Sequence, residues 1–512
     1  MERTKPLRKY SFGILFALIL LAQISFVIYK ADYTGITYDE AYSYLFFAQS
    51  THEALTSYVN PNNNHVLNSL FMCLVDKHFS SYEHFIRLHS IGFAVLFSLS
   101  VAYIIHKTMT HGLLKIVIIG LVLLNWFIFD LSYLARGYSI ALGAFYLGLA
   151  LLLKLMSKKI SYKFCFWLPI LVLSATNFLA LGSMVSSTFV LISMNAVFIF
   201  LFSHCVFRNV PNKIRYLLVN LISILLLSSV CLYPLYKDLY RDIFAARDNF
   251  GKATFSTHIK QLLVDSLSSQ QNPLGLVALY ILIFMVSLAL VFAVSRSFRQ
   301  INAGIWRQWL YSHSPASFVI LITLGTILIM FIHRTLLGMS LGFMRNSVFL
   351  VPLVLISSGI LVDKLCIGLS NHKASKSAFL GCYAAISIVL ILLNLPSRHA
   401  VFIHSWKTQS LSGPLARRLK ELDPRKTWRI KLTEKTKYLC WPFQYYVQLG
   451  YKLKAAPPES WDIAVVHKTE KKGQAEYLDE NRFSYFDCRV LINSKSSEAI
   501  SAGKKLASKY GP

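Results

Sequence analysis

The sequence has few acidic residues and few cysteines for its length. Its 512 residues include 24 aspartates and glutamates against 52 lysines and arginines, and only 8 cysteines. The cysteines lack the spacing of metal ligands, so no metal centre built on cysteine is indicated. The sequence also has no glycine-rich phosphate loop, no HExxH and no GxSxG motif, which leaves the nucleotide-hydrolysing, zinc-protease and serine-hydrolase classes unsupported.

Long apolar runs are what the sequence has in abundance. Hydrophobic residues make up 55% of the chain, and the mean hydropathy is +0.50. This is too apolar for a soluble globular protein and typical of a polytopic α-helical membrane protein. About eleven stretches approach the length that crosses a bilayer. They are approximately 11–29, 88–106, 113–130, 138–155, 164–180, 184–203, 216–235, 274–294, 316–333, 347–362 and 378–395.

The positions of lysine and arginine predict the orientation in the membrane. With the N-terminus in the cytoplasm, every even-numbered connection between spans carries lysine or arginine, as the positive-inside rule requires. We therefore interpret the net charge of +28 as a topology signal and an attraction to anionic lipid, not as nucleic-acid binding. This orientation places a first loop, about residues 30–87, on the outer side, together with the tail after residue 395.

The tail, residues 396–512, differs in composition from the transmembrane domain, residues 1–395, and predicts a small extracytoplasmic α/β domain. Within it the pattern predicts one helix and three strands, which are 413–422, 428–432, 462–467 and 489–493. Cys440 and Cys488 both lie in the tail. An oxidising compartment would permit a disulfide between them.

Two adjacent carboxylates, Asp39 and Glu40, follow the first apolar run. Placing a charged side chain near a bilayer costs free energy unless the charge is paired or serves a function. Two adjacent acids here therefore indicate a structural or catalytic role. In one interpretation Asp39 caps a helix predicted from Glu40 to Gln49 and has no catalytic role. In the other it is a catalytic base. Further along the loop, residues 66–79 predict a helix that lies in the membrane interface.

Four arginines lie at external helix ends, where the positive-inside rule would not place them; they are Arg87, Arg136, Arg334 and Arg345. One explanation is snorkelling of each side chain to lipid headgroups. The other is a pocket for phosphate, because guanidinium groups bind phosphate oxygens bidentately. A carboxylate beside such a pocket predicts group transfer from a lipid phosphate. The carboxylate would take a proton from an acceptor hydroxyl, and the cations would stabilise the leaving phosphate.

A polar turn, residues 62–65, precedes the interfacial helix. Its asparagines and His65 are consistent with a helix cap. They are equally consistent with orienting a substrate or a metal-bound water. The sequence requires no cofactor, and it leaves a divalent cation open without supporting one.

Four motifs resemble the GT-C superfamily of integral-membrane glycosyltransferases, in the branch of the protein O-mannosyltransferases and the aminoarabinose transferase of lipid A. In chain order they are Tyr38–Ala41, Asn64–Leu70 with Ile86–Ser90, Ala135–Tyr138, and Met344–Arg345 with Pro352. The motif order and the number of spans agree over about residues 10–395. Family members usually have two prolines after the histidine, where this chain has Val66 and Leu67.

The resemblance implies an inverting glycosyltransferase with a polyprenyl-phosphate-linked sugar as donor, Asp39 as the base and Glu40 as its helper. The substrate-binding residues expected from it and from the charge pattern are His65, Arg87, Arg136, Tyr138, Arg334 and Arg345. Of these, Arg136 and Arg345 match family positions near the donor phosphate, whereas a structural role is the alternative for Arg87. The acceptor would be a glycolipid, a polysaccharide or a protein, and the location the outer face of a bacterial inner membrane. A competing class is a lipid-linked glycan flippase, but a transporter would show inverted repeats and charges at mid-membrane.

Overall fold

The computed structural model describes sixteen segments of the chain. They are residues 5–56, 65–79, 82–157, 162–202, 213–236, 262–264, 266–267, 273–299, 315–337, 347–369, 372–394, 411–433, 436–455, 461–467, 476–477 and 488–492. The chain divides into two compact units. The helical unit is Met1–Ser25, Ser90–Ser132 and Gly137–Pro396, and the mixed unit is Phe26–His89, Tyr133–Arg136 and Ser397–Pro512.

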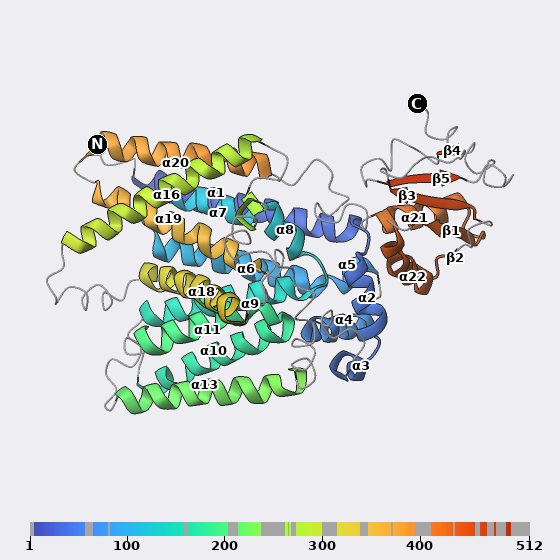
Figure 1. The fold of residues 1–512 in the computed structure, drawn as a ribbon, viewed down its shortest axis with the longest axis horizontal. Helices are drawn as coiled ribbons and strands as arrows, with labels where there is room; N and C mark the ends of the chain where they lie inside the picture. Colours follow the sequence, from blue (N-terminus) through green and yellow to red (C-terminus); the bar gives the residue numbers. More distant parts are fainter. Residues whose placement is uncertain are drawn as a thin grey trace. The chain divides into compact units, whose positions relative to one another are not determined.

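Long apolar helices make up the helical unit (Figure 1). They are α6 (Leu88–Thr108), α7 (Gly112–Leu123), α8 (Trp126–Ser132), α9 (Gly137–Ser157), α10 (Tyr162–Ser183), α11 (Thr188–Val197), α13 (Lys213–Tyr236), α16 (Pro273–Arg299), α18 (Pro315–Leu337), α19 (Leu350–Gly368) and α20 (Lys373–Asn394). Most of α1 (Lys5–Tyr33) belongs to this unit, whereas its last turns and the first two residues of α6 belong to the mixed unit. Within the helical unit α10 packs between α9 and α13.

Several of these helices are suited to crossing a membrane. Among the described residues, seven helices are long and apolar enough, or eight if α7 and α8, which meet at a 54° bend, form one span. Nine of the eleven predicted stretches fall mainly on a single described helix, whereas 113–130 covers α7 and α8, and 184–203 includes the shorter α11. The chain is therefore a multi-pass membrane protein, whereas the count of eleven spans stays a prediction.

The mixed unit combines the first loop with the tail. The loop forms α2 (Tyr38–Phe47), α3 (Thr51–Thr56), α4 (Val66–His78) and α5 (Glu83–Ile86), and the tail forms α21 (Ser412–Leu422) and α22 (Cys440–Gln448). The described strands of the tail are β1 (Trp428–Leu432), β2 (Leu453–Ala455), β3 (Ile463–His467), β4 (Glu476–Tyr477) and β5 (Cys488–Ile492). The predicted tail helix and the three predicted strands coincide with α21, β1, β3 and β5 to within one residue.

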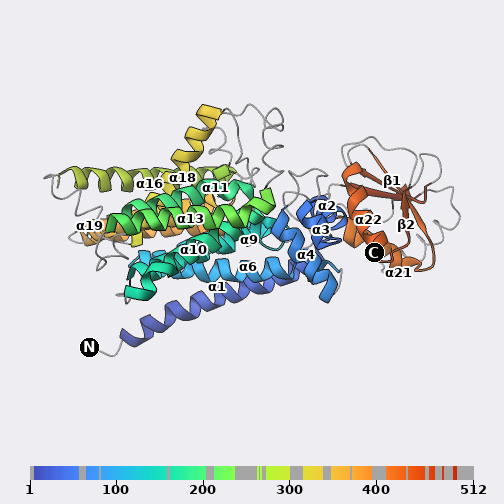
Figure 2. The same cartoon turned by 90° about the horizontal axis from the view of Figure 1, so that it is seen from below.

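The strands form one mixed sheet in the order β2-β1-β3-β5-β4. β1 is parallel to β2 and β3, whereas β5 is antiparallel to β3 and β4. The β1–α22–β2 segment is a strand–helix–strand unit, because a parallel pair needs a crossover connection. α21 and α22 lie against the sheet (Figure 1 and Figure 2).

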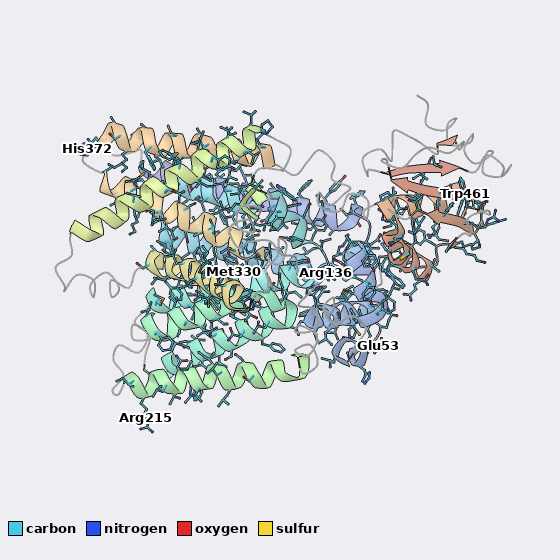
Figure 3. The ribbon with its side chains drawn as sticks, viewed as in Figure 1. Glu53, Arg136, Arg215, Met330, His372 and Trp461 are labelled. Carbon is cyan, nitrogen blue, oxygen red and sulfur yellow. The ribbon has the colours of Figure 1, made fainter. Side chains whose placement is uncertain are left out.

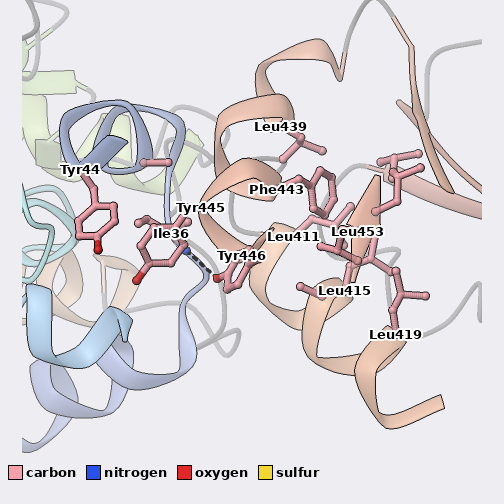
Figure 4. Packing of buried hydrophobic residues seen from close by; sticks show 14 of the residues in the cluster. Ile36, Tyr44, Leu411, Leu415, Leu419, Leu439, Phe443, Tyr445, Tyr446 and Leu453 are labelled. Carbon is pink, nitrogen blue, oxygen red and sulfur yellow. Dashed lines mark hydrogen bonds between the residues drawn. The ribbon is translucent and has the colours of Figure 1, made fainter. Parts of the chain in front are cut away.

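One apolar core joins the first loop to the tail (Figure 4). Leu411, the N-cap of α21, and Leu415 and Leu419 within the helix recur every four residues and form a buried stripe. The same core takes in Ile36 and Tyr44 from the loop. The sequence placed the loop in the transmembrane domain, but its apolar side chains are buried by the tail, and the two form a single unit.

Candidate active site

The first helix of the loop, α2, begins at a capping box. Thr37 is the N-cap: its hydroxyl accepts from the Glu40 N–H (3.2 Å), and the Glu40 carboxylate accepts from the Thr37 N–H (3.0 Å). This reciprocal pair satisfies two backbone donors of the first turn. Asp39 is the second helical residue, so the interpretation of Asp39 as the cap is wrong.

Glu40 and Arg87 form a fully buried ion pair, and both side chains are 0% exposed. Arg87 Nε and Nη2 donate to the two carboxylate oxygens at 2.8 and 2.6 Å. The other donors of Arg87 reach the carbonyls of Ala31 (2.9 Å), Thr34 (2.7 Å) and Gly35 (3.2 Å). A guanidinium has five N–H donors, and here all five meet protein acceptors. This argues for a structural role for Arg87 and against the expected contact with substrate.

Glu40 is saturated in the same way. Besides Arg87 and Thr37, the Ala135 N–H donates to Glu40 Oε1 at 2.7 Å. Burial by itself raises the pKa of Glu40, but the charge and hydrogen bonds of Arg87, with the two N–H donors, outweigh it and lower the pKa below its ordinary value. The buried Glu40 carboxylate thus accepts from four donors, which are two nitrogens of Arg87 and the N–H groups of Thr37 and Ala135. The expectation that Glu40 assists catalysis is therefore replaced by a structural role.

Asp39 lies in a different environment from its neighbour. Its side chain is 19% exposed, and Arg136, 3% exposed, approaches Asp39 Oδ2 with Nη2 at 3.4 Å. Arg136 Nη1 also donates to the Asp39 carbonyl and to Ser43 Oγ, both at 3.3 Å. An opposite charge at this distance stabilises the carboxylate form that a base requires. Arg136 lies with the loop helices of the mixed unit (Figure 3), and the structure brings these two predicted residues together.

Aromatic side chains gather beside Asp39. Tyr38, Tyr42 and Phe46 recur every four residues along α2, so they share a stripe of the helix. Trp441 of α22 meets the rings of Tyr42 and Phe46 edge-on, with centroids 5.8 and 5.0 Å apart, and its indole N–H donates to the Tyr38 hydroxyl at 3.1 Å. Sequence reasoning missed this group. The four-residue spacing of aromatic residues in α2 predicts an aromatic stripe. The contact of Trp441 with that stripe joins residues about 400 positions apart, and no local pattern indicates it.

A second contact from the tail fixes the start of α2. Glu83 is buried and accepts hydrogen bonds from the Tyr446 hydroxyl and from Arg417 Nη1 (3.2 Å). The Tyr446 oxygen in turn accepts from the Ile36 N–H at 3.2 Å (Figure 4). Burial and the charge of Glu83 raise the pKa of Tyr446 well above its ordinary value, so the hydroxyl stays protonated as a donor. The tail therefore sets the position of the residue before the helix cap.

The roles of the other predicted substrate-binding residues stay predictions. Tyr138 lies in α9 of the helical unit and is 1% exposed. His65 occupies the N-cap position of α4, and its role stays a prediction. The side chain of Arg334 and all of Arg345 lie outside the described residues, so their roles stay predictions as well.

Cys440 and Cys488 were the predicted disulfide, and no metal ligands were predicted. Cys440 has a free thiol at the start of α22, and the side chain of Cys488 lies outside the described residues. The structure thus gives the predicted disulfide no support. In the described part of the chain, no group of three or more His, Cys, Asp or Glu side chains is placed to hold a metal ion.

No protein-family model matches the sequence, and no curated protein matches it. The fold is similar to solved structures. ArnT from Cupriavidus metallidurans bound to undecaprenyl phosphate gives a TM-score of 0.49 at 10% identity, covering 95% of this chain and 98% of that chain. The oligosaccharyltransferase AglB from Archaeoglobus fulgidus, in complex with an inhibitory peptide and a dolichol-phosphate, gives 0.44 at 13%, covering 88% and 65%. These identities and TM-scores are too low to assign a function.

Proposed function

We propose that the chain is an inverting glycosyltransferase that moves a sugar from a polyprenyl-phosphate-linked donor to an acceptor hydroxyl. The observation that carries the proposal is the Asp39–Arg136 pair, a partly exposed carboxylate held by a buried guanidinium. The pair unites two of the four motifs that resemble GT-C glycosyltransferases. Glu40 and Arg87 make the pair possible by holding the start of α2 rigid.

The reaction is a single displacement. Asp39 accepts the proton of the acceptor hydroxyl while the hydroxyl oxygen forms a bond to the anomeric carbon. The bond between that carbon and the phosphate oxygen breaks, and its electron pair leaves with the phosphate, so the configuration is inverted. Positive charge near the leaving phosphate stabilises the developing anion. Arg136 supplies such charge beside Asp39, and Arg345 is the second candidate.

The aromatic side of α2 is assigned to the acceptor. A binding site combines apolar and aromatic surface with a few polar groups that fix orientation. Tyr42, Phe46 and Trp441 provide such surface next to Asp39, and Tyr38 and Trp441 are partly exposed. The electron-rich face of an aromatic ring attracts the C–H groups of a sugar. A saccharide acceptor, as in a glycolipid or polysaccharide, fits this surface.

The site is assigned to the outer face of a bacterial inner membrane, with the N-terminus in the cytoplasm. The lysine and arginine pattern supports this orientation. That compartment offers no nucleotide sugars, so a donor carried by a membrane lipid is the natural supply. Lipid-linked donors also suit a chain with many apolar helices.

The test compares cells that carry wild-type protein, Asp39→Asn, Asp32→Asn or no protein, by mass spectrometry of glycolipids and surface polysaccharide. Asp32 is the matched control because it is an acid of the same unit that is 53% exposed and forms an ion pair with the exposed His84. We expect Asp39→Asn and the deletion to lack the same sugar and to accumulate its lipid-phosphate donor.

Asp32→Asn should match wild type in the same comparison. Asp39→Asn removes the base but conserves volume, so the loss of rate should be at least about 100-fold, the lower end for general base catalysis. Normal sugar transfer by Asp39→Asn would overturn the proposal. Accumulation of a complete lipid-linked glycan in the deletion alone would favour a transporter.

A further inference from the structure

A turn of four residues, Tyr133–Arg136, belongs to the mixed unit, although the stretches before and after it in the sequence belong to the helical unit. Ala135 in this turn is 0% exposed, and side chains hold both polar groups of its backbone. Its N–H donates to Glu40 Oε1 at 2.7 Å, and its carbonyl accepts from Asn68 Nδ2 at 2.8 Å. The turn is thus fixed by α2 through its N–H and by α4 through its carbonyl.

The Asn68 amide has one orientation that suits its neighbours. With Nδ2 on the Ala135 carbonyl, its Oδ1 lies 2.8 Å from His89 Nε2 and accepts that proton. The reversed amide would set two acceptor oxygens against each other at Ala135. His89 is held in turn by stacking on Phe71, with centroids 5.5 Å apart. The fully buried Asn68 is therefore preset to hold this carbonyl.

The residue that follows the held carbonyl is Arg136. Three of its contacts with α2 are long, at 3.3 Å to the Asp39 carbonyl, 3.3 Å to Ser43 Oγ and 3.4 Å to the Asp39 carboxylate. Hydrogen bonds weaken quickly beyond about 3.2 Å. A small displacement of the turn would therefore separate the guanidinium from the carboxylate.

We propose that Asn68 is a positioning residue for the transfer reaction. By holding the Ala135 carbonyl it sets the backbone from which Arg136 reaches Asp39. The inference rests on the proposed function, since it matters to the rate only if Asp39 is the base. The competing view is that Asn68 is a buried amide whose bonds serve stability alone, in which case its removal leaves the rate per folded molecule unchanged.

A double-mutant cycle separates the two views. Asn68→Ala and Arg136→Gln are made singly and together in the full chain, and sugar incorporation is measured per amount of folded protein. Asn68→Ala should lower the rate by about 10- to 100-fold, the range expected when a catalytic group is misplaced by about 1 Å. In the Arg136→Gln background the same change should cost less than about twofold, because the residue it positions is already gone.

The matched control is Asn125→Ala in the helical unit. Asn125 is a buried asparagine that also donates through Nδ2 to a carbonyl, that of Ser266, at 2.7 Å. Its loss should lower the thermal midpoint without lowering the rate of the folded protein. Binding of undecaprenyl phosphate, used as the probe for the donor side, should also be unchanged in Asn125→Ala.

Every outcome of the double-mutant cycle either supports or overturns the positioning role of Asn68. An unchanged rate in Asn68→Ala, or an equal loss in both backgrounds, overturns the positioning role. If Asn68→Ala yields no folded protein, the cycle is run with Asn68→Leu, which keeps the branched shape but has no N–H donor for the Ala135 carbonyl. Normal turnover in Asp39→Asn would overturn the proposed function itself, whereas a dead Asp39→Asn with an additive cycle overturns only this inference.

Discussion

Two carboxylates that are neighbours in the chain have opposite environments. Glu40 is fully buried, and a guanidinium fork and two backbone N–H groups hold its oxygens. Asp39 is 19% exposed, and the Arg136 guanidinium approaches it at 3.4 Å. A fully buried carboxylate is out of reach of a substrate, whereas a partly exposed one can be reached. At the level of single residues, this difference separates the structural acid from the candidate base.

Loss of Arg87 should be among the most damaging single changes in the mixed unit. Arg87→Met leaves the Glu40 carboxylate buried without a cation, which costs about 3–5 kcal/mol of unfolding free energy. Arg417→Met is the control: it also removes a guanidinium from a carboxylate, that of Glu83, but Arg417 is 35% exposed, and partly exposed pairs contribute about 0–1 kcal/mol. Denaturant titration in detergent measures both, and equal losses would contradict a structural role for the buried pair.

Acid should weaken the mixed unit. Burial raises the pKa of Asp462, but hydrogen bonds from Arg429 and the charge of Lys426 outweigh it and lower the pKa below the ordinary 3.8. The unfolded chain therefore takes up the proton first as pH falls, so this stabilisation is complete above the ordinary pKa and is lost as pH falls through the lowered one. Glu40, lowered from 4.5, acts in the same direction.

Unfolding measured between pH 7 and about pH 3 tests this linkage. The wild-type free energy of unfolding should decline with acidification, and Asp462→Asn should show a shallower decline from a lower starting value. The difference should be modest, because Arg429 is 43% exposed and solvent screens the pair. A stability that rises with acid would show that other groups dominate.

Some of these residue roles could be predicted from the sequence and others could not. Thr37 and Glu40 have the spacing of a capping box, a local pattern that predicts the start of α2. From the sequence we considered only Asp39 as the cap. The pairing of Glu40 with Arg87 spans 47 residues, and the charge pattern alone offered Arg87 as a phosphate ligand. The burial that consumes its donors is a tertiary property, which no local pattern contains.

At the level of elements, α2 is supported by a helix from the far end of the chain. α22 packs on α2 through Trp441, and through Tyr445, which meets Tyr44 edge-on at 5.2 Å. The elements themselves were largely predictable: α21 and three strands appear where apolar spacing indicated. Their packing on the loop was not, because apolar faces are readable from spacing whereas their partners are not.

Trp441 provides a test of the acceptor surface. Trp441→Ala should raise the acceptor KM by about tenfold, since an aromatic contact contributes about 0.5–1.5 kcal/mol and a factor of ten corresponds to about 1.4 kcal/mol. Trp441→Phe keeps a ring but loses the bond to Tyr38, so its effect should be smaller. Binding of undecaprenyl phosphate should not change in either variant.

The control for this measurement is Trp461→Ala, which changes another tryptophan of the tail (Figure 3). The Lys431 ammonium lies 5.9 Å from the centre of the Trp461 ring. It should leave the acceptor KM unchanged. If Trp461→Ala and Trp441→Ala raise the acceptor KM equally, the effect reflects general damage to the tail. In that case the aromatic side of α2 would not be the acceptor surface.

At the level of the whole molecule, the chain passes between the two units five times, after Ser25, His89, Ser132, Arg136 and Pro396. The last passage lies one residue beyond the boundary drawn from composition, which stays a prediction. The sequence could not show the other four, because they fall inside or beside helices and turns with no change in composition. Composition alone does not reveal which segments pack on the tail.

A chain that ends at residue 395 should lose activity completely while its apolar helices still insert in the membrane. Without the tail, Ile36 and Tyr44 lose the core that buries them, and α2 loses its support. Limited proteolysis should cut the first loop of the truncated chain faster than that of the full chain. Tyr446→Phe, which removes only the hydroxyl at Ile36 and Glu83, should give an intermediate rate of cutting.

The bond between Ile36 and Tyr446 spans 410 residues of sequence, and this separation has a consequence for synthesis. At about 5–20 residues per second, the ribosome needs roughly 20–80 s to translate the 410 residues from Ile36 to Tyr446. During that interval the apolar side chains of the first loop, such as Ile36 and Tyr44, lack the tail residues that bury them in the complete chain. The candidate base is therefore assembled only when translation is nearly finished, so an incomplete chain left in the membrane would be catalytically silent.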